Sequence, residues 1–497
     1  MSEHLRLLAG EPVETLEGWI ARGGGKGLSA ARDMGPEALV VQVEASGLRG
    51  RGGAGFPTGM KWRTVLEHRS PELPTPVVVN AAEGEPGTFK DRTLLRHNPY
   101  QAVEGALIAA SAVGSDWIIF GLKASFEREL TRLRKAIDEI VNAGWSDGIS
   151  IDVELGPDAY LYGEETALLE VIDGRQPFPR VAPPWRHGID EIGDGASTAS
   201  DLELSPAEGE GELPPTLVNN LETVSNLPGI VAHGADWFRF VGTERSPGTI
   251  VVTVSGALQR DGVKEVAMGT PLREAIELIG GGARGGREIT AALSGVSNAL
   301  LTGAQLDTPL TYEDMASAGA GLGSAGFLVF DDRTDWVAAA HGVSRFLSVE
   351  SCGQCQPCKD DGKAIAAALD RLRRSEGGEH DLDVAKHKLN TVIRGARCFL
   401  AQQHQTVVGS ILERFPDSFH AHARGIADPA DVLPIAEIID LPGERVQIDQ
   451  RQLRKQPDWT YNDTDSGESP ADRIDERLEE AEHNAAAAAA AKRASSR

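Results

Sequence analysis

The sequence predicts an α/β fold in which a domain built on a parallel sheet is followed by a small β-rich domain and a helical domain. Three observations support this order. Short apolar runs alternate with helix-like segments over residues 36–246, β runs dominate 247–332, and the chain becomes helical after about 333, where all four cysteines lie. Strands alternating with helices of this length are typical of a parallel sheet with helical crossovers. The length of 497 residues is enough for several domains.

The first domain follows an N-terminal lead, residues 1–35, which shows no strong periodicity. Its predicted strands are short, apolar and rich in β-branched residues, as buried parallel strands are. They lie at 75–80 (TPVVVN), 117–120 (WIIF) and 151–155. The segments between them have the apolar spacing or the strong helix formers of helices, at 101–113 and 125–141.

The remaining chain divides into three parts. Residues 247–332 are predicted to form a small β-rich domain, with strands at 249–255 and 326–330 and one helix at 271–280 opened by proline. Residues 333–430 are predicted to be helical. Residues 431–497 form a C-terminal extension whose acidic tail is closed by seven alanines, and residues 190–215 interrupt the first domain as an acidic surface insertion.

Charge and composition exclude several classes of protein. The net charge is −25, and two acidic stretches, 190–212 and 462–484, contribute −15 of it. Nucleic-acid binding is not expected, because phosphate contacts need clustered Lys and Arg, and direct membrane insertion is not expected, because no run of 18 apolar residues exists. The absence of a signal-peptide pattern and the low number of cysteines lead us to expect a cytoplasmic protein.

The four cysteines form a ligand set. Cys352, Cys355 and Cys358 are separated by two residues each, and Cys398 follows after 39 intervening residues. Three thiolates in one tight loop with a distant fourth are typical of a [4Fe–4S] cluster. Zinc is the main alternative, since it also accepts four cysteines, although its sites usually combine two separate pairs of cysteines, each pair spaced by two residues.

A glycine-rich loop precedes the first predicted strand. Residues 47–59 read GLRGRGGAGFPTG, with five glycines in nine residues, and Arg49, Arg51 and Lys61 add positive charge. Backbone N–H groups in such a loop can approach a phosphate closely. The loop matches neither the Walker nor the Rossmann pattern, so a purely structural turn is the alternative interpretation. Phe56 stands where an aromatic ring could stack on a nucleotide.

Acidic turns follow two further predicted elements. Residues 80–92 (NAAEGEPGTFKDR) directly follow a parallel strand, where ligands of open α/β sheets bind. Glu83 and Glu85 could bind ribose hydroxyls there, or could simply be solvated acids. In residues 160–167 (YLYGEETA) Gly163 permits close approach before a helix, although acids at a helix start are also favoured by the helix dipole.

Taken together, these motifs resemble the NADH-binding flavoprotein subunit of respiratory complex I and related chains of NAD-linked formate dehydrogenases and hydrogenases. The resemblance covers about residues 36–425. It rests on five motifs in the family order: RGRGGAGFPTGMKW (49–62), EPGTFKDR (85–92), GEETALLE (163–170), VNNLET (218–223) and SCGQCQPC (351–358).

The resemblance implies a Rossmann-like domain for FMN and NADH, a β-grasp-like domain and a helical [4Fe–4S] domain. The loop residues implied to contact FMN and NADH are Gly50, Arg51, Gly52, Gly53, Ala54, Gly55, Phe56, Pro57, Thr58 and Lys61. The residues implied to line FMN are Asn80, Tyr160, Gly163, Glu164, Val218, Asn219 and Asn220. Glu83, Glu85 and Glu165 would face NADH, and Phe56 and Trp185 would flank its adenine. No side chain is expected to act as a catalytic acid, base or nucleophile, because the flavin carries the chemistry.

The function implied by the resemblance is oxidation of NAD(H) through FMN, with single electrons passed by the cluster to iron–sulfur partner subunits of a quinone-linked complex. Alternatives are the diaphorase subunit of a soluble formate dehydrogenase or hydrogenase, and a non-catalytic relay or assembly subunit. The chain departs from the family at Ala82, where an acid is usual, at Ala182, where lysine is usual, and after Cys398, where it reads FLAQQHQ.

Overall fold

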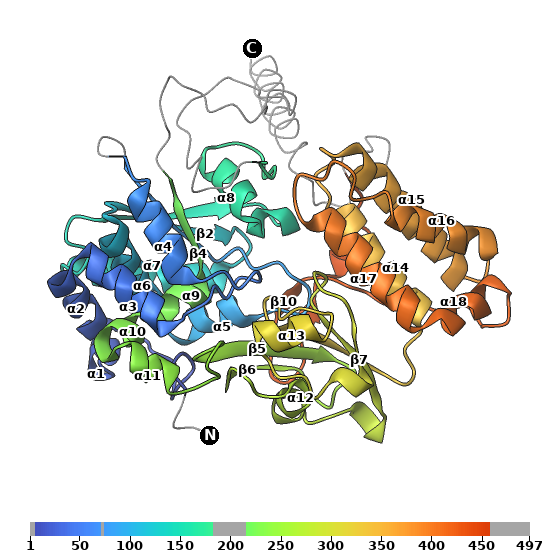
Figure 1. The fold of residues 1–497 in the computed structure, drawn as a ribbon, viewed down its shortest axis with the longest axis horizontal. Coiled ribbons are helices and arrows are strands. Elements are labelled where there is room, and N and C mark those ends of the chain that lie inside the picture. The colour runs from blue at the N-terminus through green and yellow to red at the C-terminus, as the bar shows by residue number, and fades with distance from the viewer. Residues whose placement is uncertain (1–4, 71–73, 182–214, 458–497) are drawn as a thin grey trace, which may run out of the picture.

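The structure, a computed structural model, describes residues 5–70, 74–181 and 215–457. Figure 1 shows the arrangement: the α/β part lies on the left, the helices of residues 336–423 lie on the right, and a second sheet lies below and between them. The acidic insertion and the acidic C-terminal tail lie outside the described residues, apart from residue 215 at the end of the insertion.

The α/β part is built on a four-stranded sheet, which confirms the predicted parallel sheet. The strands run in the order β3-β2-β1-β4, and every neighbouring pair is parallel. Their bounds are β1 (Val77–Asn80), β2 (Trp117–Lys123), β3 (Ser150–Gly156) and β4 (Leu217–Asn220). Both faces of the sheet are buried, since Val77 and Val79 join one apolar core and Val78 joins another. The last pair in register, Asn80 and Asn220, brings two amide side chains to one edge.

Helices cover both faces of this sheet. α6 packs on β1 and β2, and α8 packs on the side of Val78. The helices of this part are α1 (Leu16–Ala21), α2 (Lys26–Met34), α3 (Pro36–Ser46), α4 (Thr58–Glu67), α5 (Lys90–His97), α6 (Pro99–Val113), α7 (Glu127–Asn142), a 3-10 turn (Tyr160–Gly163), α8 (Glu165–Ile172), α9 (Leu221–Ser225), α10 (Leu227–His233) and α11 (Ala235–Arg239).

The N-terminal lead forms α1 and α2, although its sequence shows no strong periodicity. Leu7 and Leu28 join the main core of the α/β part. The buried carboxylate of Glu104, on α6, accepts hydrogen bonds from the backbone N–H groups of Gly25 and Leu28 at 2.9 and 3.1 Å. An acid distant in sequence thus stabilises the start of α2, because it accepts hydrogen bonds from N–H groups there and its negative charge interacts favourably with the helix dipole. A local sequence pattern cannot reveal this contact.

The second part is a mixed five-stranded sheet in the order β6-β5-β9-β7-β8, on which α12 packs. Its bounds are β5 (Thr249–Gly256), β6 (Gly262–Ala267), α12 (Leu272–Gly280), β7 (Ile289–Ser294), β8 (Leu301–Thr302), α13 (Tyr312–Ser317) and β9 (Gly326–Asp331), with 3-10 turns at Arg284–Gly286 and Gly303–Gln305. The sequence predicted one helix here, and the structure adds α13, a short helix capped by the Thr311 side chain.

The third part is helical, as predicted, and its core is made by helices that contact one another. They are α14 (Trp336–Val349), α15 (Gln356–Arg373), α16 (Glu379–Leu389), α17 (Leu400–Arg414) and α18 (Pro416–Ala423). Residues 431–457, which we call the strap, follow with β10 (Ile438–Asp440), β11 (Gln447–Ile448) and a 3-10 turn (Gln450–Leu453). No helix in the described ranges is both long and apolar enough to span a bilayer.

The strap contacts the other parts through charged side chains. The Arg92 guanidinium donates to the carbonyl oxygens of Ile438 and Ile439 at 3.0 and 2.6 Å. Lys455 forms a buried ion pair of 2.7 Å with Glu350 at the end of α14. The strap therefore connects the α/β part to the helical part.

Candidate cofactor site

A central cavity of about 760 Å³ lies where the α/β part, the second sheet and the start of α17 meet. It is bounded by the carboxyl ends of β1 and β4, the position at which open α/β sheets bind ligands. The predicted site residues that line it are Gly50, Gly52, Gly53, Ala54, Gly55, Phe56, Thr58, Lys61, Asn80, Glu83, Glu85, Tyr160, Gly163, Glu164, Glu165, Val218, Asn219 and Asn220. Trp185 lies outside the described residues.

The glycine-rich loop closes on itself at the edge of this cavity. The Gly50 N–H donates to the Phe56 carbonyl oxygen at 2.8 Å, and Arg49 Nε donates to the Gly55 carbonyl oxygen at 2.6 Å. Gly53 has a φ of +134°, and no atom of the described residues other than 52–54 lies within 4 Å of the place where a Cβ would stand. The loop therefore presents bare backbone to open space, as a loop that cradles a ligand must.

Thr58 provides the clearest sign that the cavity receives a polar ligand. Its hydroxyl is buried and has no hydrogen-bond partner among the residues that the structure describes. Thr58 is also the first residue of α4, where the helix dipole favours an anion, although its own N–H already donates to the Leu48 carbonyl oxygen at 2.9 Å. A buried hydroxyl without a partner is costly unless a ligand satisfies it, and a phosphate oxygen of FMN fits this requirement.

Two predicted residues of the loop do not line the cavity, Arg51 and Pro57. The buried Arg51 guanidinium donates instead to the carbonyl oxygens of Pro247 and Thr249 at 3.3 and 3.0 Å. It thus ties the loop to the start of the second sheet. Pro57 is the N-cap residue of α4.

Lys61 lies between the two sets of predicted ligands. Its ammonium group is 2.6 Å from Glu165 Oε1 and donates to the Val218 carbonyl oxygen at 3.0 Å. Glu164 caps α8 through the N–H groups of Thr166 and Ala167. The charge of Lys61 is therefore already partly balanced before any phosphate enters.

The floor of the cavity is a buried charged cluster. Lys90 Nζ lies 2.8 Å from Asp91 Oδ1, 3.0 Å from Glu222 Oε2 and 3.0 Å from Asn220 Oδ1. Asn220 Nδ2 donates to Asp91 Oδ2 at 2.7 Å, and Asn80 Nδ2 donates to the Gly163 carbonyl oxygen at 2.8 Å. Donors and acceptors in this floor can face the polar ring of a flavin.

Glu83 is held by backbone rather than left free in the cavity. Its carboxylate accepts the N–H groups of Lys90 and Asp91 at 2.8 and 3.1 Å, which caps α5. Burial, with repulsion from Asp91 as the second cause, raises the pKa of Glu83 to about 7. Burial therefore favours the neutral form of this acid more than water does.

Glu85 joins three parts of the chain. Its carboxylate accepts the Val296 N–H at 2.7 Å and the hydroxyls of Ser297 and Tyr160. The Tyr160 hydroxyl in turn accepts a hydrogen bond of 2.9 Å from Gln403 on α17. Burial raises the pKa of Glu85 and raises the pKa of Tyr160 well above its usual value, so Tyr160 stays protonated.

The four cysteines line one small hollow, together with Leu161, Pro179 and the start of α17. None of them forms a disulfide. Over the residues that the structure describes, no three His, Cys, Asp or Glu side chains converge as the ligands of a single metal ion would. A cluster spreads its four ligands over separate irons, which suits thiols that surround one hollow. Cys398 lines both this hollow and the central cavity.

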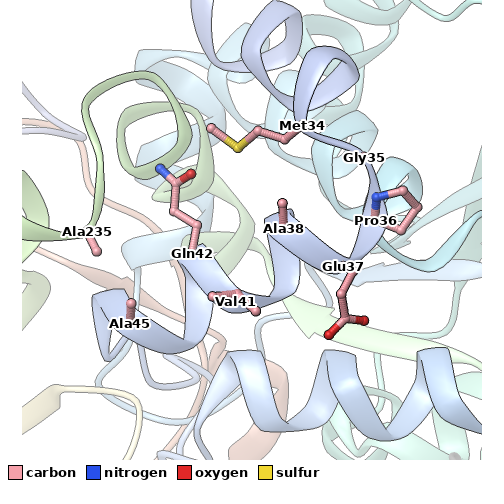
Figure 2. Close-up of a pocket in the computed structure, with 9 residues that line it drawn as sticks. All are labelled: Met34, Gly35, Pro36, Glu37, Ala38, Val41, Gln42, Ala45 and Ala235. Atoms are coloured by element: carbon pink, nitrogen blue, oxygen red, sulfur yellow. The ribbon is translucent and has the colours of Figure 1, made fainter.

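A second large hollow is a different kind of feature. It is an open groove on the outside of the α/β part, between α2, α3 and α11 (Figure 2). Met34, Val41 and Ala235 give it a mainly apolar wall, and Glu37 is the one acid among the described residues that line it. It lacks the converging polar groups of the central cavity, so we assign no chemistry to it.

Sequence comparisons identify all three parts. The Nuo51 FMN-binding domain family matches residues 43–229, the SLBB domain family matches 251–294, and the NADH-ubiquinone oxidoreductase-F iron-sulfur binding region matches 338–422. An NADH-quinone oxidoreductase subunit of Rhizobium meliloti is 34% identical over 82% of this chain and 94% of its own length. The chain belongs to the family of complex I flavoprotein subunits. Its cofactors are accordingly FMN and a [4Fe–4S] cluster, and the zinc alternative is not supported.

Other members of this family serve hydrogenases. The NADP-reducing hydrogenase subunit HndC of Solidesulfovibrio fructosivorans is 35% identical over 84% of this chain and 83% of its own length. A crystal structure of an NAD+-reducing [NiFe]-hydrogenase in the H2-reduced state superposes with a TM-score of 0.70 at 32% identity, covering 86% of this chain and 70% of that chain. These likenesses confirm the three-part fold of the flavoprotein subunit.

Sequence reasoning missed several residues that line the cavity. Lys90 and Asp91 lie within the motif EPGTFKDR, so their position was signalled although their role was not. Ser297, Tyr312 and Gln403 come from distant parts of the chain, and no local pattern marks them. Only the folded arrangement brings them to the flavoprotein site.

Proposed function

We propose that this chain oxidises NADH and passes the electrons, one at a time, to an iron–sulfur partner subunit of a quinone-linked complex. One observation carries the proposal: Cys398 is shared by the cavity suited to FMN and the hollow suited to the cluster. FMN supplies the chemistry when bound, because it accepts two electrons as a hydride and releases them singly. The role of the protein is to bind and orient FMN and NADH and to shield them from water.

The residues divide this work among themselves. Thr58, the bare loop backbone around Gly53 and the start of α4 would hold the FMN phosphate. The floor around Asn80, Lys90 and Asn220 would hold the polar ring of the flavin. No side chain needs to exchange a proton with the substrate, since the pKa of Tyr160 stays high and the carboxylate of Glu85 accepts hydrogen bonds from Val296, Ser297 and Tyr160.

NADH is the proposed nucleotide, with Glu83, Glu85 and Glu165 on its side of the cavity. The charged side chains that line the cavity support this choice. The acids are Glu83, Glu85, Asp91, Glu164 and Glu165, and the bases are Arg49, Lys61 and Lys90. Each of these bases already forms an ion pair, with Glu313, Glu165 and Asp91 respectively. The 2′-phosphate of NADPH would therefore find no cation among these three bases that is not already paired with a carboxylate.

The experiment that tests the proposal is NADH-driven reduction of ferricyanide by the purified chain loaded with FMN and iron. Turnover that depends on FMN is expected, and it also excludes a non-catalytic relay subunit. A fully loaded chain that cannot oxidise NADH would refute the proposal. The similarity to HndC supports a second candidate function, that of a hydrogenase diaphorase subunit. Hydrogen-dependent NAD+ reduction by the assembled native complex would identify that function.

A further inference from the structure

Phe399 is an exposed aromatic side chain in the wall of the central cavity. The residue is 59% exposed, whereas Phe89 and Phe238 are almost fully buried. Among the described residues that line the cavity, Phe399 and Phe56 are the large apolar side chains left more than a third exposed. An apolar ring that faces a cavity suited to a flat ligand indicates a contact that the ligand completes.

The position of Phe399 is fixed on both sides. Cys398 precedes it and belongs to the cluster hollow, and Leu400, which follows, is 3% exposed in the helical core. One turn later on α17, Gln403 donates its N–H to the Phe399 carbonyl oxygen at 2.9 Å and its side chain to Tyr160. The backbone of Phe399 is therefore fixed at the wall of the cavity, between the cluster ligand and the helical core.

The wall of the cavity has two chemically different regions. One is the charged floor around Asn80, Lys90 and Asn220, whose groups are bonded to one another. The other is formed by Cys398, Phe399 and Leu400 at the start of α17. A flavin has the same division, with a polar pyrimidine ring at one end and an apolar dimethylbenzene ring at the other.

We propose that Phe399 packs against the dimethylbenzene ring of FMN and thereby orients that edge of the flavin toward Cys398. The inference rests on the proposed function, because it requires FMN in this cavity. It assigns a flavin-contacting role to a residue that sequence reasoning treated only as a departure from the family pattern. The contact would also keep water away from the path between flavin and cluster, because the ring covers that side of the flavin.

The test uses the full chain with its cluster loaded and its FMN removed, and it measures FMN affinity by quenching of flavin fluorescence. Phe399→Ala removes the ring and is expected to weaken FMN binding about tenfold. Phe399→Tyr keeps the ring and should restore the affinity to within about twofold. Phe399→Leu keeps an apolar side chain without the ring, and its FMN affinity should lie between those of the alanine and tyrosine variants. The leucine variant also allows the test to be made if the alanine variant loses its cluster.

Phe240→Ala is the matched control, since Phe240 is 80% exposed and does not line the cavity. Its FMN affinity should equal that of the unchanged chain. Unchanged FMN affinity in Phe399→Ala and Phe399→Leu would overturn the inference, and a raised KM for NADH alone would assign the ring to the nucleotide instead. If the unchanged chain binds FMN but does not oxidise NADH, the proposed function fails while the affinity comparison still decides this inference.

Discussion

Replacing Lys90 by methionine should strongly destabilise the protein. The Lys90 side chain is 1% exposed and lies 2.8 and 3.0 Å from carboxylate oxygens of Asp91 and Glu222, which are 5% and 0% exposed. Lys90→Met keeps the length of the side chain but leaves two buried carboxylates without their cation. Removing one partner of a buried ion pair in this way costs about 3–5 kcal/mol.

The assay is thermal unfolding of the FMN-free chain, in which the midpoint should fall by roughly 5 °C. Lys135→Met is the matched control, because Lys135 is 50% exposed and lies 3.7 Å from Glu139 on the surface. Its change should stay within about 0.5 kcal/mol. Adding Glu222→Gln to Lys90→Met should recover part of the loss, because one uncompensated charge is then removed.

The loss should also depend on pH in a defined direction. Burial raises the pKa of Glu222, and the charge of Lys90 opposes that rise. In Lys90→Met the pKa of Glu222 in the folded protein rises further, so the folded state binds a proton that the unfolded state has released. Stability is then lost as pH rises above the unfolded value of about 4.3 and recovers as pH falls. A loss below about 1 kcal/mol, or one that does not change with pH, would refute this reasoning.

Three further outcomes are expected. Cys398→Ala should lower iron and acid-labile sulfide from about four of each per chain, while stoichiometric zinc in the unchanged chain would contradict the cluster. Thr58→Val should weaken FMN binding about fivefold without lowering thermal stability, because the hydroxyl has no partner to lose among the described residues. Steady-state kinetics should favour NADH over NADPH, and deletion of residues 190–212 should leave FMN content unchanged. Equal kcat/KM for both nucleotides would overturn the preference, and loss of FMN on deletion would show that the segment is structural.

Local sequence predicted the elements whose residues act on their neighbours. The run before Asn80 is apolar and β-branched, so its burial on both faces could be predicted from the sequence. The parallel sheet could be predicted because such strands alternate with helices along the chain. The glycine-rich loop could be predicted as a ligand-binding loop because only glycine exposes its backbone without a side chain and readily adopts a positive φ, such as the +134° of Gly53. These are properties of short segments.

The missed features depend on contacts between distant segments. Arg51 looked like a phosphate ligand, but it donates to the carbonyl oxygens of Pro247 and Thr249, about two hundred residues away in sequence. Gln403 reaches the site only because α17 starts beside Tyr160. Charge and hydrogen-bonding capacity can be read from a residue type, but the partner that satisfies them is set by the tertiary fold.

The strap gives a physical reason why a site assembled from three parts can keep one geometry. The Val446 N–H donates to Asp261 at 3.0 Å in the second sheet, Lys123 of the α/β part pairs with Glu437, and Lys455 pairs with Glu350 of α14. The same three parts supply the walls of the cavity. Hydrogen bonds and buried ion pairs are directional, so they fix the orientation of these parts more narrowly than apolar contact does. The contacts of the strap therefore fix the arrangement of the three parts that surround the cavity and the cluster hollow, and one of them, the pair of Lys455 with Glu350, lies directly beside Cys352.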